Sequence, residues 1–504
     1  MPESRPSPLA IAPSAQRPVP PGDATPPSAP KPGESSLGLG APSDRIGTEL
    51  PHFADPSAPD PALEAFLHQA ATQLCRWFGS AAAASPLPAL SVIPDVAPEA
   101  AGIGAERLLA DLQLVMEGAY NPNHPGALAH LDPPPLVASV VGDLICAGLN
   151  NNLLAEELSP SLTRLERSLG GWLATSLGLP PGASGVAASG GSLSNLMALV
   201  TARHRAGLAC RSDAVVLCSD DAHVSLTKAM AVMGLPPEAL LRIPPDSQGL
   251  LRCDLLEDQL ARLRRQGVPV IAVVATAGTT VRGAIDPLPE IAALCRRHGH
   301  WLHVDGAIGA VFALSASSRS LLQGLELADS ITVNPQKLLG ITKTSSLLLL
   351  ASPQALIEAF STGLPYMEPS WGGAHGGEAG LQGSRPAEIL KLWLGLRQLG
   401  RVGISGLLDA AIERRRLLQS LLADDPRLLL LEGPLHLLAF RPAQADPAAS
   451  ETWSSQTREA LLADQLMLSR PFYGGHHHLK AVLGNPHTRE ADLDRLVRIV
   501  RHSL

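Results

Sequence analysis

Short apolar runs alternate with helical patterns through the middle of the chain. Three apolar runs, Ala214–Ser219, Val268–Ala275 and Trp301–Val304, have the composition of β-strands and are bounded by turn residues. A helical pattern, Leu288–His298, lies between the last two. Continuous apolar strands separated by helices favour a mainly parallel sheet that is covered on both faces. The pattern therefore predicts an α/β fold, in which ligands gather at the carboxyl ends of the strands.

Helical spacing of apolar residues dominates on both sides of this region. It predicts helices at Pro61–Phe78, Gly104–Met116 and Ser161–Leu177, and a further helix at Ala387–Leu399 before a Leu- and Arg-rich end. The first part of the chain is dominated by Pro, Ala, Ser and Gly, which cannot bury enough apolar surface to fold, so we expect disorder there. The expected organisation is a disordered tail at 1–60, an N-terminal helical segment at 61–135, a large α/β domain at 136–385 and a small C-terminal domain at 386–504.

Composition excludes several classes of protein. The 504 residues are 45% apolar and 17% charged, and the net charge of −8 without a basic stripe argues against a nucleic-acid partner. Six scattered cysteines form no C-x-x-C pair, and the triple His476-His477-His478 is interpreted as a solvated turn, so no metal site is expected. The apolar runs are shorter than the roughly 20 residues that span a bilayer, and no secretory signal pattern opens the chain. We expect no membrane partner and a cytoplasmic location.

Four features in the α/β region together suggest one chemistry. A turn, Ser189–Ser192, precedes a helix, and its glycines would let the backbone N–H groups approach a phosphate. His223 follows a strand and offers a flat ring for stacking, and Asp305 ends another strand, where a buried carboxylate needs a cationic partner. Lys337, among apolar residues beyond a strand, would become a nucleophilic amine. Each has an ordinary interpretation as a turn, a cap or a surface residue, but together they are the parts of a pyridoxal-5′-phosphate (PLP) site.

The motifs that carry these residues are similar to those of a known family. GVAASGGSLSNLMAL, HVSLTKA, ATAGTTVRGAIDPL, WLHVDGA, ADSITVNPQKLLG, LQGSRPAEILKLWL and LGNPHT resemble the group II PLP-dependent amino-acid decarboxylases. These include glutamate, aromatic-amino-acid, cysteine sulfinate and diaminobutyrate decarboxylases, and the resemblance runs from about His124 to Asn485. It implies the PLP-dependent transferase fold type I, a homodimer with active sites at the subunit interface, and a carboxy-lyase that turns an L-amino acid into an amine and CO₂.

The resemblance also implies roles for individual residues. Lys337 would carry PLP as an aldimine, Asp305 would pair with the ring nitrogen and His223 would stack on the ring. Tyr366, before the Gly-rich stretch Met367–Gly380, would return a proton to Cα from a mobile lid. The other cofactor-binding residues would be those around the phosphate and the ring: Gly190, Gly191, Ser192, Thr276, Ala307, Asn334 and Gln336.

Departures from the family pattern concern the substrate. Gln336 stands where the family has histidine, and Lys480 stands where its glutamate-type members have an arginine that binds a carboxylate. A lysine is a point charge rather than a planar fork, so carboxylate binding would be altered. His124 matches the family's entry motif, and His130 is a candidate substrate contact or a structural residue. Lys480 favours a side-chain carboxylate, and a diamino acid remains open.

Two other readings stay open on sequence grounds. Another fold-type I enzyme, an aminotransferase or a lyase acting at Cβ, would share the lysine and the aspartate but would not need Tyr366. A catalytically silent homologue acting as a binding protein is disfavoured by the intact Lys337, Asp305 and His223.

Overall fold

The computed structural model describes residues 50–89, 93–363 and 375–504, and residues 50–504 form one compact unit. Tyr366 and most of the stretch Met367–Gly380 lie outside the described residues. Among the helices that the structure describes, none is long and apolar enough to cross a membrane.

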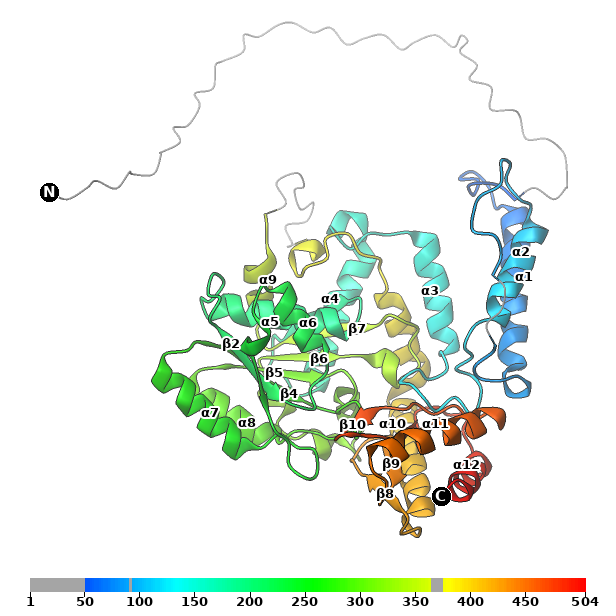
Figure 1. Ribbon diagram of the computed structural model, residues 1–504. Helices are drawn as coiled ribbons and strands as arrows, with labels where there is room; N and C mark the ends of the chain where they lie inside the picture. The colour runs from blue at the N-terminus through cyan, green and yellow to red at the C-terminus, as the bar shows by residue number, and fades with distance from the viewer. Residues whose placement is uncertain (1–49, 90–92, 364–374) are drawn as a thin grey trace, which may run out of the picture. The chain divides into compact units, whose positions relative to one another are not determined.

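A seven-stranded sheet forms the centre of the unit (Figure 1). Its order is β1-β7-β6-β5-β4-β2-β3, and β7 alone runs against its neighbours, so six strands are parallel. Every residue of β2, β4, β6 and β7 is buried, which requires cover on both faces. The predicted α/β class with a mainly parallel sheet is confirmed. The strands are β1 Ser184–Ala188, β2 Val215–Ser219, β3 Leu240–Ile243, β4 Val270–Thr276, β5 Trp301–Gly306, β6 Ser330–Val333 and β7 Ser346–Leu350.

The helices begin and end where local sequence signals place them. In α1 the Asp60 carboxylate accepts hydrogen bonds from the amides of Ala62 and Leu63, and Pro61 occupies the first turn. Helix α8 ends at His298 and is followed by Gly299, whose φ of 71° suits glycine. The four helices predicted at Pro61–Phe78, Gly104–Met116, Ser161–Leu177 and Leu288–His298 agree with the structure to within one residue at each end. The helices before the C-terminal region are α1 Pro61–Gly79, α2 Ala105–Glu117, α3 Val137–Leu149, α4 Pro160–Ser176, α5 Gly191–Arg205, α6 Ser225–Val232, α7 Cys253–Gln266, α8 Leu288–His298 and α9 Gln354–Phe360.

The C-terminal region is built on the long helix α10, Ile389–Ala423. The helix predicted at Ala387–Leu399 stops at Gly400, whose φ of 60° interrupts the helix, but a second helical stretch continues beyond it. A three-stranded antiparallel sheet and two more helices follow, gathered at the far end of α10 in Figure 1. These elements are β8 Leu428–Leu431, β9 Leu437–Pro442, β12 Leu479–Val482, α11 Pro447–Ala463 and α12 Glu490–His502.

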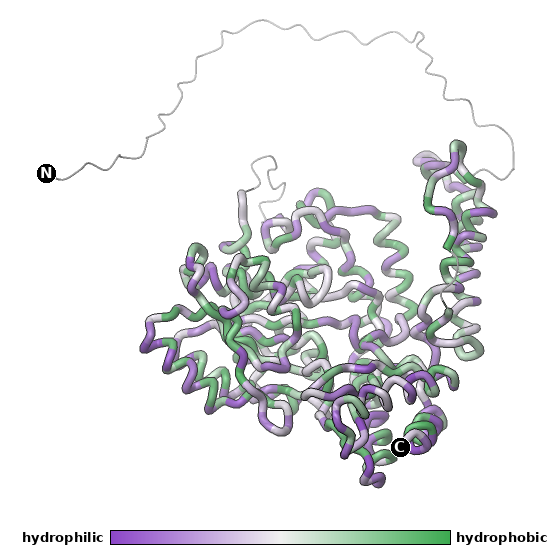
Figure 2. Tube along the Cα trace, in the orientation of Figure 1, coloured by the Kyte–Doolittle hydropathy of each residue, from purple (hydrophilic) through white to green (hydrophobic). Residues whose placement is uncertain are grey.

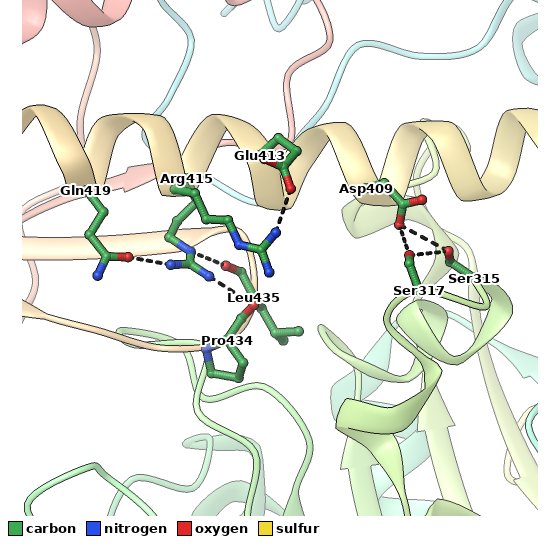
Figure 3. A network of polar contacts seen from close by, with 9 residues as sticks. Ser315, Ser317, Asp409, Glu413, Arg415, Gln419, Pro434 and Leu435 are labelled. Carbon is green, nitrogen blue, oxygen red and sulfur yellow. Dashed lines mark hydrogen bonds and ion pairs between the residues drawn. The ribbon is translucent and has the colours of Figure 1, made fainter.

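Helix α10 connects two of the three hydrophobic cores of the described residues. Its first half packs in the core of the large sheet, and its second half packs in a separate core with β9, α11 and α12. Figure 3 shows polar contacts that hold it on both sides: Asp409 accepts from Ser315 (3.0 Å), and Arg415 donates to the carbonyls of Leu435 (2.9 Å) and Pro434 (3.3 Å). These contacts fix the C-terminal sheet relative to the large one.

The histidine triple is not a solvated turn as predicted. His476–His477 form β11, which pairs with β10 (Phe472–Tyr473) in a hairpin, and His478 is buried. The turn itself is made by Gly474 and Gly475, both at positive φ, and therefore lies just before the histidines.

The surface helices α7 and α8 carry both hydrophilic and hydrophobic residues, shown as purple and green in Figure 2. This mixture is typical of helices with one face on the core and the other in solvent.

Candidate active site

A cavity of about 200 Å³ opens at the carboxyl ends of the parallel strands. Eight of the residues predicted to bind the cofactor line it, from five separate segments of the chain. The residues that line the cavity are Gly191, Ser192, Asn195, Asp221, His223, Thr276, Gly278, Thr280, Asp305, Ala307, Ile308, Asn334 and Lys337.

Lys337 enters the cavity from the last residue of the 3-10 turn Pro335–Lys337, which follows β6. Its backbone amide donates to the carbonyl of Asn334 (3.0 Å), so the turn is closed on itself. Burial lowers the pKa of Lys337, and the nearby charge of Asp305 acts in the opposite direction. A larger share of the amine is therefore uncharged and nucleophilic than for an exposed lysine.

Asp305 is buried near the end of β5 and faces the same cavity. One carboxylate oxygen accepts from the Asn195 side-chain amide (2.8 Å) and the other from the backbone amide of Ala307 (3.2 Å). Both donors are neutral, so neither hydrogen bond brings a positive charge to the carboxylate. The carboxylate can therefore attract a cation in the cavity, and its charge acts on Lys337 there.

His223 precedes α6 and lines the cavity beside Asp305. Its Nδ1 accepts from the backbone amide of Ser225 (3.2 Å), which orients the ring. Burial lowers the pKa of His223, partly opposed by Asp305, so the neutral imidazole is favoured. A neutral flat ring suits stacking on an aromatic cofactor.

The start of α5 provides a close approach to the cavity. A Cβ placed on Gly191 would lie 3.0 Å from the Asn334 side-chain nitrogen, so a larger residue would fill the space that the glycine leaves. The first N–H groups of a helix have no partner within the helix and can bind an anion. Thr276 adds a buried hydroxyl that has no hydrogen-bond partner among the described residues. A phosphate-bearing planar ring would fit this arrangement.

Two opposite charges lie at the cavity: Asp221 lines it, and Lys480, which does not line it, contacts the lining residue Thr280. Lys480, on β12, is buried and its ammonium donates to the carbonyl of Thr280 (3.1 Å). Burial, together with the charge of Lys337, lowers the pKa of Lys480 to about 8. Asp221 accepts from the hydroxyl of Tyr473 (2.7 Å), and burial raises its pKa.

Four other predicted residues do not line the cavity. Gly190 caps α5 at a φ of 119° and is the neighbour of Gly191, which lines the cavity. The side-chain oxygen of Gln336 accepts a hydrogen bond from the backbone amide of Ser345. His124 is buried in a turn where its Nδ1 accepts from the amide of Gly126 (2.8 Å), and His130 is exposed. Their assigned roles stay predictions.

Sequence reasoning missed five cavity residues: Asn195, Asp221, Gly278, Thr280 and Ile308. One of them carried a usable signal. Asn195 lies four residues after Gly191, and this spacing puts both on one face of α5.

The family model for the pyridoxal-dependent decarboxylase conserved domain matches residues 90–442. The L-2,4-diaminobutyrate decarboxylase of Rhizobium meliloti (strain 1021) is 33% identical over 416 residues, which cover 81% of this chain and 83% of the relative. The cysteine sulfinic acid decarboxylase of Rattus norvegicus is 32% identical over 345 residues, 65% of this chain and 69% of the relative.

Solved structures agree. A crystal structure of mouse CSAD has a TM-score of 0.81 at 26% identity, covering 88% of this chain and 99% of that one. A structure of Oryza sativa TDC with PLP and tryptamine has a TM-score of 0.83 at 22% identity, covering 90% and 99%, and supports the fold alone. The predicted fold type I is confirmed. The chain belongs to the group II pyridoxal-phosphate-dependent decarboxylases, and is a carboxy-lyase that acts on an amino acid with PLP as its cofactor.

Proposed function

We propose that this chain decarboxylates an L-amino acid with Lys337 as the attachment residue for PLP and Asp305 as the partner of the ring nitrogen. The observation that carries the proposal is that these two residues, far apart in the sequence, line one cavity with the anion-binding start of α5. When bound, PLP accepts the electrons that departing CO₂ leaves behind.

The other residues act by position and charge. The hydrogen bonds to Asp305 would hold its carboxylate beside the ring nitrogen of bound PLP, and a negative charge there would favour the protonated, electron-accepting ring. His223, which lines the cavity, would stack on the ring and help to exclude water from the reacting carbon. Gly191, Ser192 and Asn334 would hold the phosphate. We assign the return of a proton to Cα to Tyr366, which lies outside the described residues, on the resemblance alone.

The substrate class depends on whether Lys480 or Asp221 binds the side chain of the substrate. Lys480 would bind an anionic side chain, which is a carboxylate in L-aspartate and a sulfinate in cysteine sulfinic acid, the substrates named for two of the relatives. Asp221 would bind a side-chain ammonium, and the diaminobutyrate decarboxylases among the relatives are named for such a substrate. We propose an acidic or a diamino amino acid rather than an aromatic one.

We also propose that the chain acts as a homodimer in the cytoplasm. Helix α3 exposes large apolar side chains spaced along one face, which a second copy of the chain would cover: Val137, Val141, Leu144, Ile145 and Leu149. All six cysteines are free, as a reducing compartment favours.

The test is a screen of amino acids with the full-length protein and added PLP. We expect CO₂ and an amine from one side-chain class, and no product from Lys337→Ala. Lys228→Ala, which alters an exposed lysine on α6 outside the cavity lining, should retain activity. Borohydride reduction followed by peptide mass spectrometry should find the cofactor on Lys337 alone.

Other outcomes would overturn the proposal. A keto acid product would identify an aminotransferase. A wild-type protein that stays colourless with PLP would indicate a silent homologue. Asp221→Asn should raise KM for diamino acids and Lys480→Met should raise KM for acidic ones, so the pair of variants separates the two substrate classes.

A further inference from the structure

A buried polar network extends from Asp305 through Asn195, which also lines the cavity, into the interior of the fold. The Asn195 side-chain nitrogen donates to Asp305 (2.8 Å) and to the hydroxyl of Ser225 (2.9 Å). Its oxygen contacts the hydroxyl of Thr332 (2.7 Å) and Nε2 of His303 (3.0 Å). All five side chains are buried, and none of their roles was predicted except that of Asp305.

The network continues along the sheet from His303. Nδ1 of His303 contacts the hydroxyl of Ser330 (2.9 Å), and that hydroxyl accepts from the indole N–H of Trp301 (2.9 Å). The alternation of a β-strand explains the alignment, because Trp301, His303 and Asp305 are two residues apart on β5 and share one face. Helix α5 lies against the same face, where it brings Asn195 to the carboxylate.

Chemistry determines the direction of every hydrogen bond. A carboxylate only accepts, so the nitrogen of the Asn195 amide must face Asp305 and the oxygen must face His303. His303 then has to donate from Nε2, and a neutral ring has only one N–H, so Nδ1 must accept from Ser330. Burial lowers the pKa of His303 and keeps the ring neutral. Each donor from Trp301 onward thus points toward Asp305.

We propose that Asn195, oriented by His303 and Thr332, is a positioning residue that keeps the proton on the cofactor ring rather than on Asp305. The proposal rests on the proposed pairing of Asp305 with the ring nitrogen. In a buried acid–base pair the proton can move to the carboxylate, which leaves two neutral partners and removes the cost of burying charge. A hydrogen bond donated to the carboxylate favours its ionised form and opposes that transfer.

The side-chain amide of Asn195 connects Asp305 with His223. Asn195 donates to Ser225, and the backbone amide of Ser225 donates to His223 Nδ1. The Asn195 side chain therefore sets the position of Asp305, the proposed partner of the ring nitrogen. Through Ser225 it also sets the position of His223, which is proposed to stack on the ring. A polar residue whose hydrogen bonds are all directed is more constraining than an apolar one of the same size.

The test uses the PLP-loaded enzyme and compares variants within the network. Asn195→Leu removes the donor to Asp305, and we expect kcat to fall about tenfold to hundredfold with KM changed much less. His303→Leu cannot orient the amide, whereas His303→Gln offers a side-chain N–H in place of Nε2. We expect His303→Leu to show a smaller loss than Asn195→Leu and His303→Gln to recover most of it. Trp301→Phe, at the far end of the network, is the control and should resemble wild type.

The decisive readout is nitrogen NMR of enzyme loaded with PLP isotopically labelled at the ring nitrogen. We expect a protonated nitrogen in wild type, His303→Gln and Trp301→Phe, and a shift toward the unprotonated form in Asn195→Leu. A merely structural role would lower the melting temperature without moving this signal. An unchanged resonance in Asn195→Leu overturns the proposal. If that variant does not fold, identical resonances in His303→Leu and His303→Gln overturn it instead. An unprotonated nitrogen in the wild type would overturn the role of Asp305 itself, a separate outcome.

Discussion

Two buried carboxylates in this protein have contrasting surroundings. Glu166 on α4 meets Arg385 in a bidentate pair, with two hydrogen bonds of 2.6 Å, and both side chains are less than a tenth exposed. Asp305 receives only neutral donors, from Asn195 and from a backbone amide, and it faces a cavity. Neither Glu166 nor Arg385 lines that cavity.

The contrast separates a structural role from a functional one. A buried charge that is matched by its opposite within the fold holds segments together and offers nothing to a ligand. A buried charge that is oriented but left unneutralised beside a cavity attracts a ligand of the opposite charge. Asp305 and Arg385, the partner of Glu166, both lie in motifs that resemble the family's, so the motif alone does not reveal which role applies.

Breaking the ion pair between Glu166 and Arg385 should have the largest effect, and this effect should be on stability. Glu166→Gln leaves Arg385 buried without its anion, and we expect the free energy of unfolding to fall by about 3–5 kcal/mol in urea titration. The double variant Glu166→Leu/Arg385→Met, which removes both charges, should recover most of the loss. Equal destabilisation of the single and double variants would contradict this account, because shape and not charge would then matter.

Removing the unmatched charge should act on catalysis instead. Asp305→Asn keeps the shape but loses the anion beside the ring nitrogen, and we expect kcat to fall about 10²–10³-fold while the melting temperature hardly changes. Asp329→Asn is the matched control. Asp329 is a carboxylate next to the opposite end of the same sheet, where it accepts from the amide of Leu302 (2.7 Å), and its variant should retain kcat. Full activity of Asp305→Asn would be incompatible with the proposed mechanism.

A smaller effect should appear in the pH dependence, through Lys480. Its pKa of about 8 means that the ammonium is charged below that pH and neutral above it. If the substrate is acidic, KM should therefore rise about tenfold by about pH 9 in the wild type. Lys480→Arg, which stays charged, should flatten that rise.

The same lysine also links pH to stability, with a sign that can be checked. Between pH of about 8 and 10.5 the unfolded chain keeps the proton that the folded protein has lost. The contribution of Lys480 to the free energy of unfolding should then increase with pH in this window, and Lys480→Met should remove the increase. A decrease over the same range would show that the ammonium is not desolvated as described.

Much of the fold and of the site could be predicted from local patterns. The strand runs and the helix ends at Pro61 and His298 follow from apolar spacing and from capping residues, which act over a few positions. His223, Asp305 and Lys337 were found because each follows or ends an apolar run, and parallel strands bring their carboxyl ends together. The chemical types of these three residues then narrowed the choice of cofactor to PLP.

Side-chain direction was beyond the sequence. Gln336 sits next to Lys337 and was expected at the phosphate, but its oxygen is held by the Ser345 amide. His124 matches a family motif, yet its ring closes a buried turn. Asn195 was passed over as an ordinary helical residue, because an amide acquires a role only from the groups around it.

The sequence by itself determined the α/β architecture, the family and the residue types of the site, because these depend on local periodicity and on motifs. Only the tertiary structure decided that Asp305 is oriented by Asn195 and accepts hydrogen bonds from neutral donors alone, that Glu166 is neutralised by Arg385, and that Lys480 and Asp221 bring opposite charges near one cavity. The physical reason is that burial and charge matching are properties of contacts between segments distant in the chain.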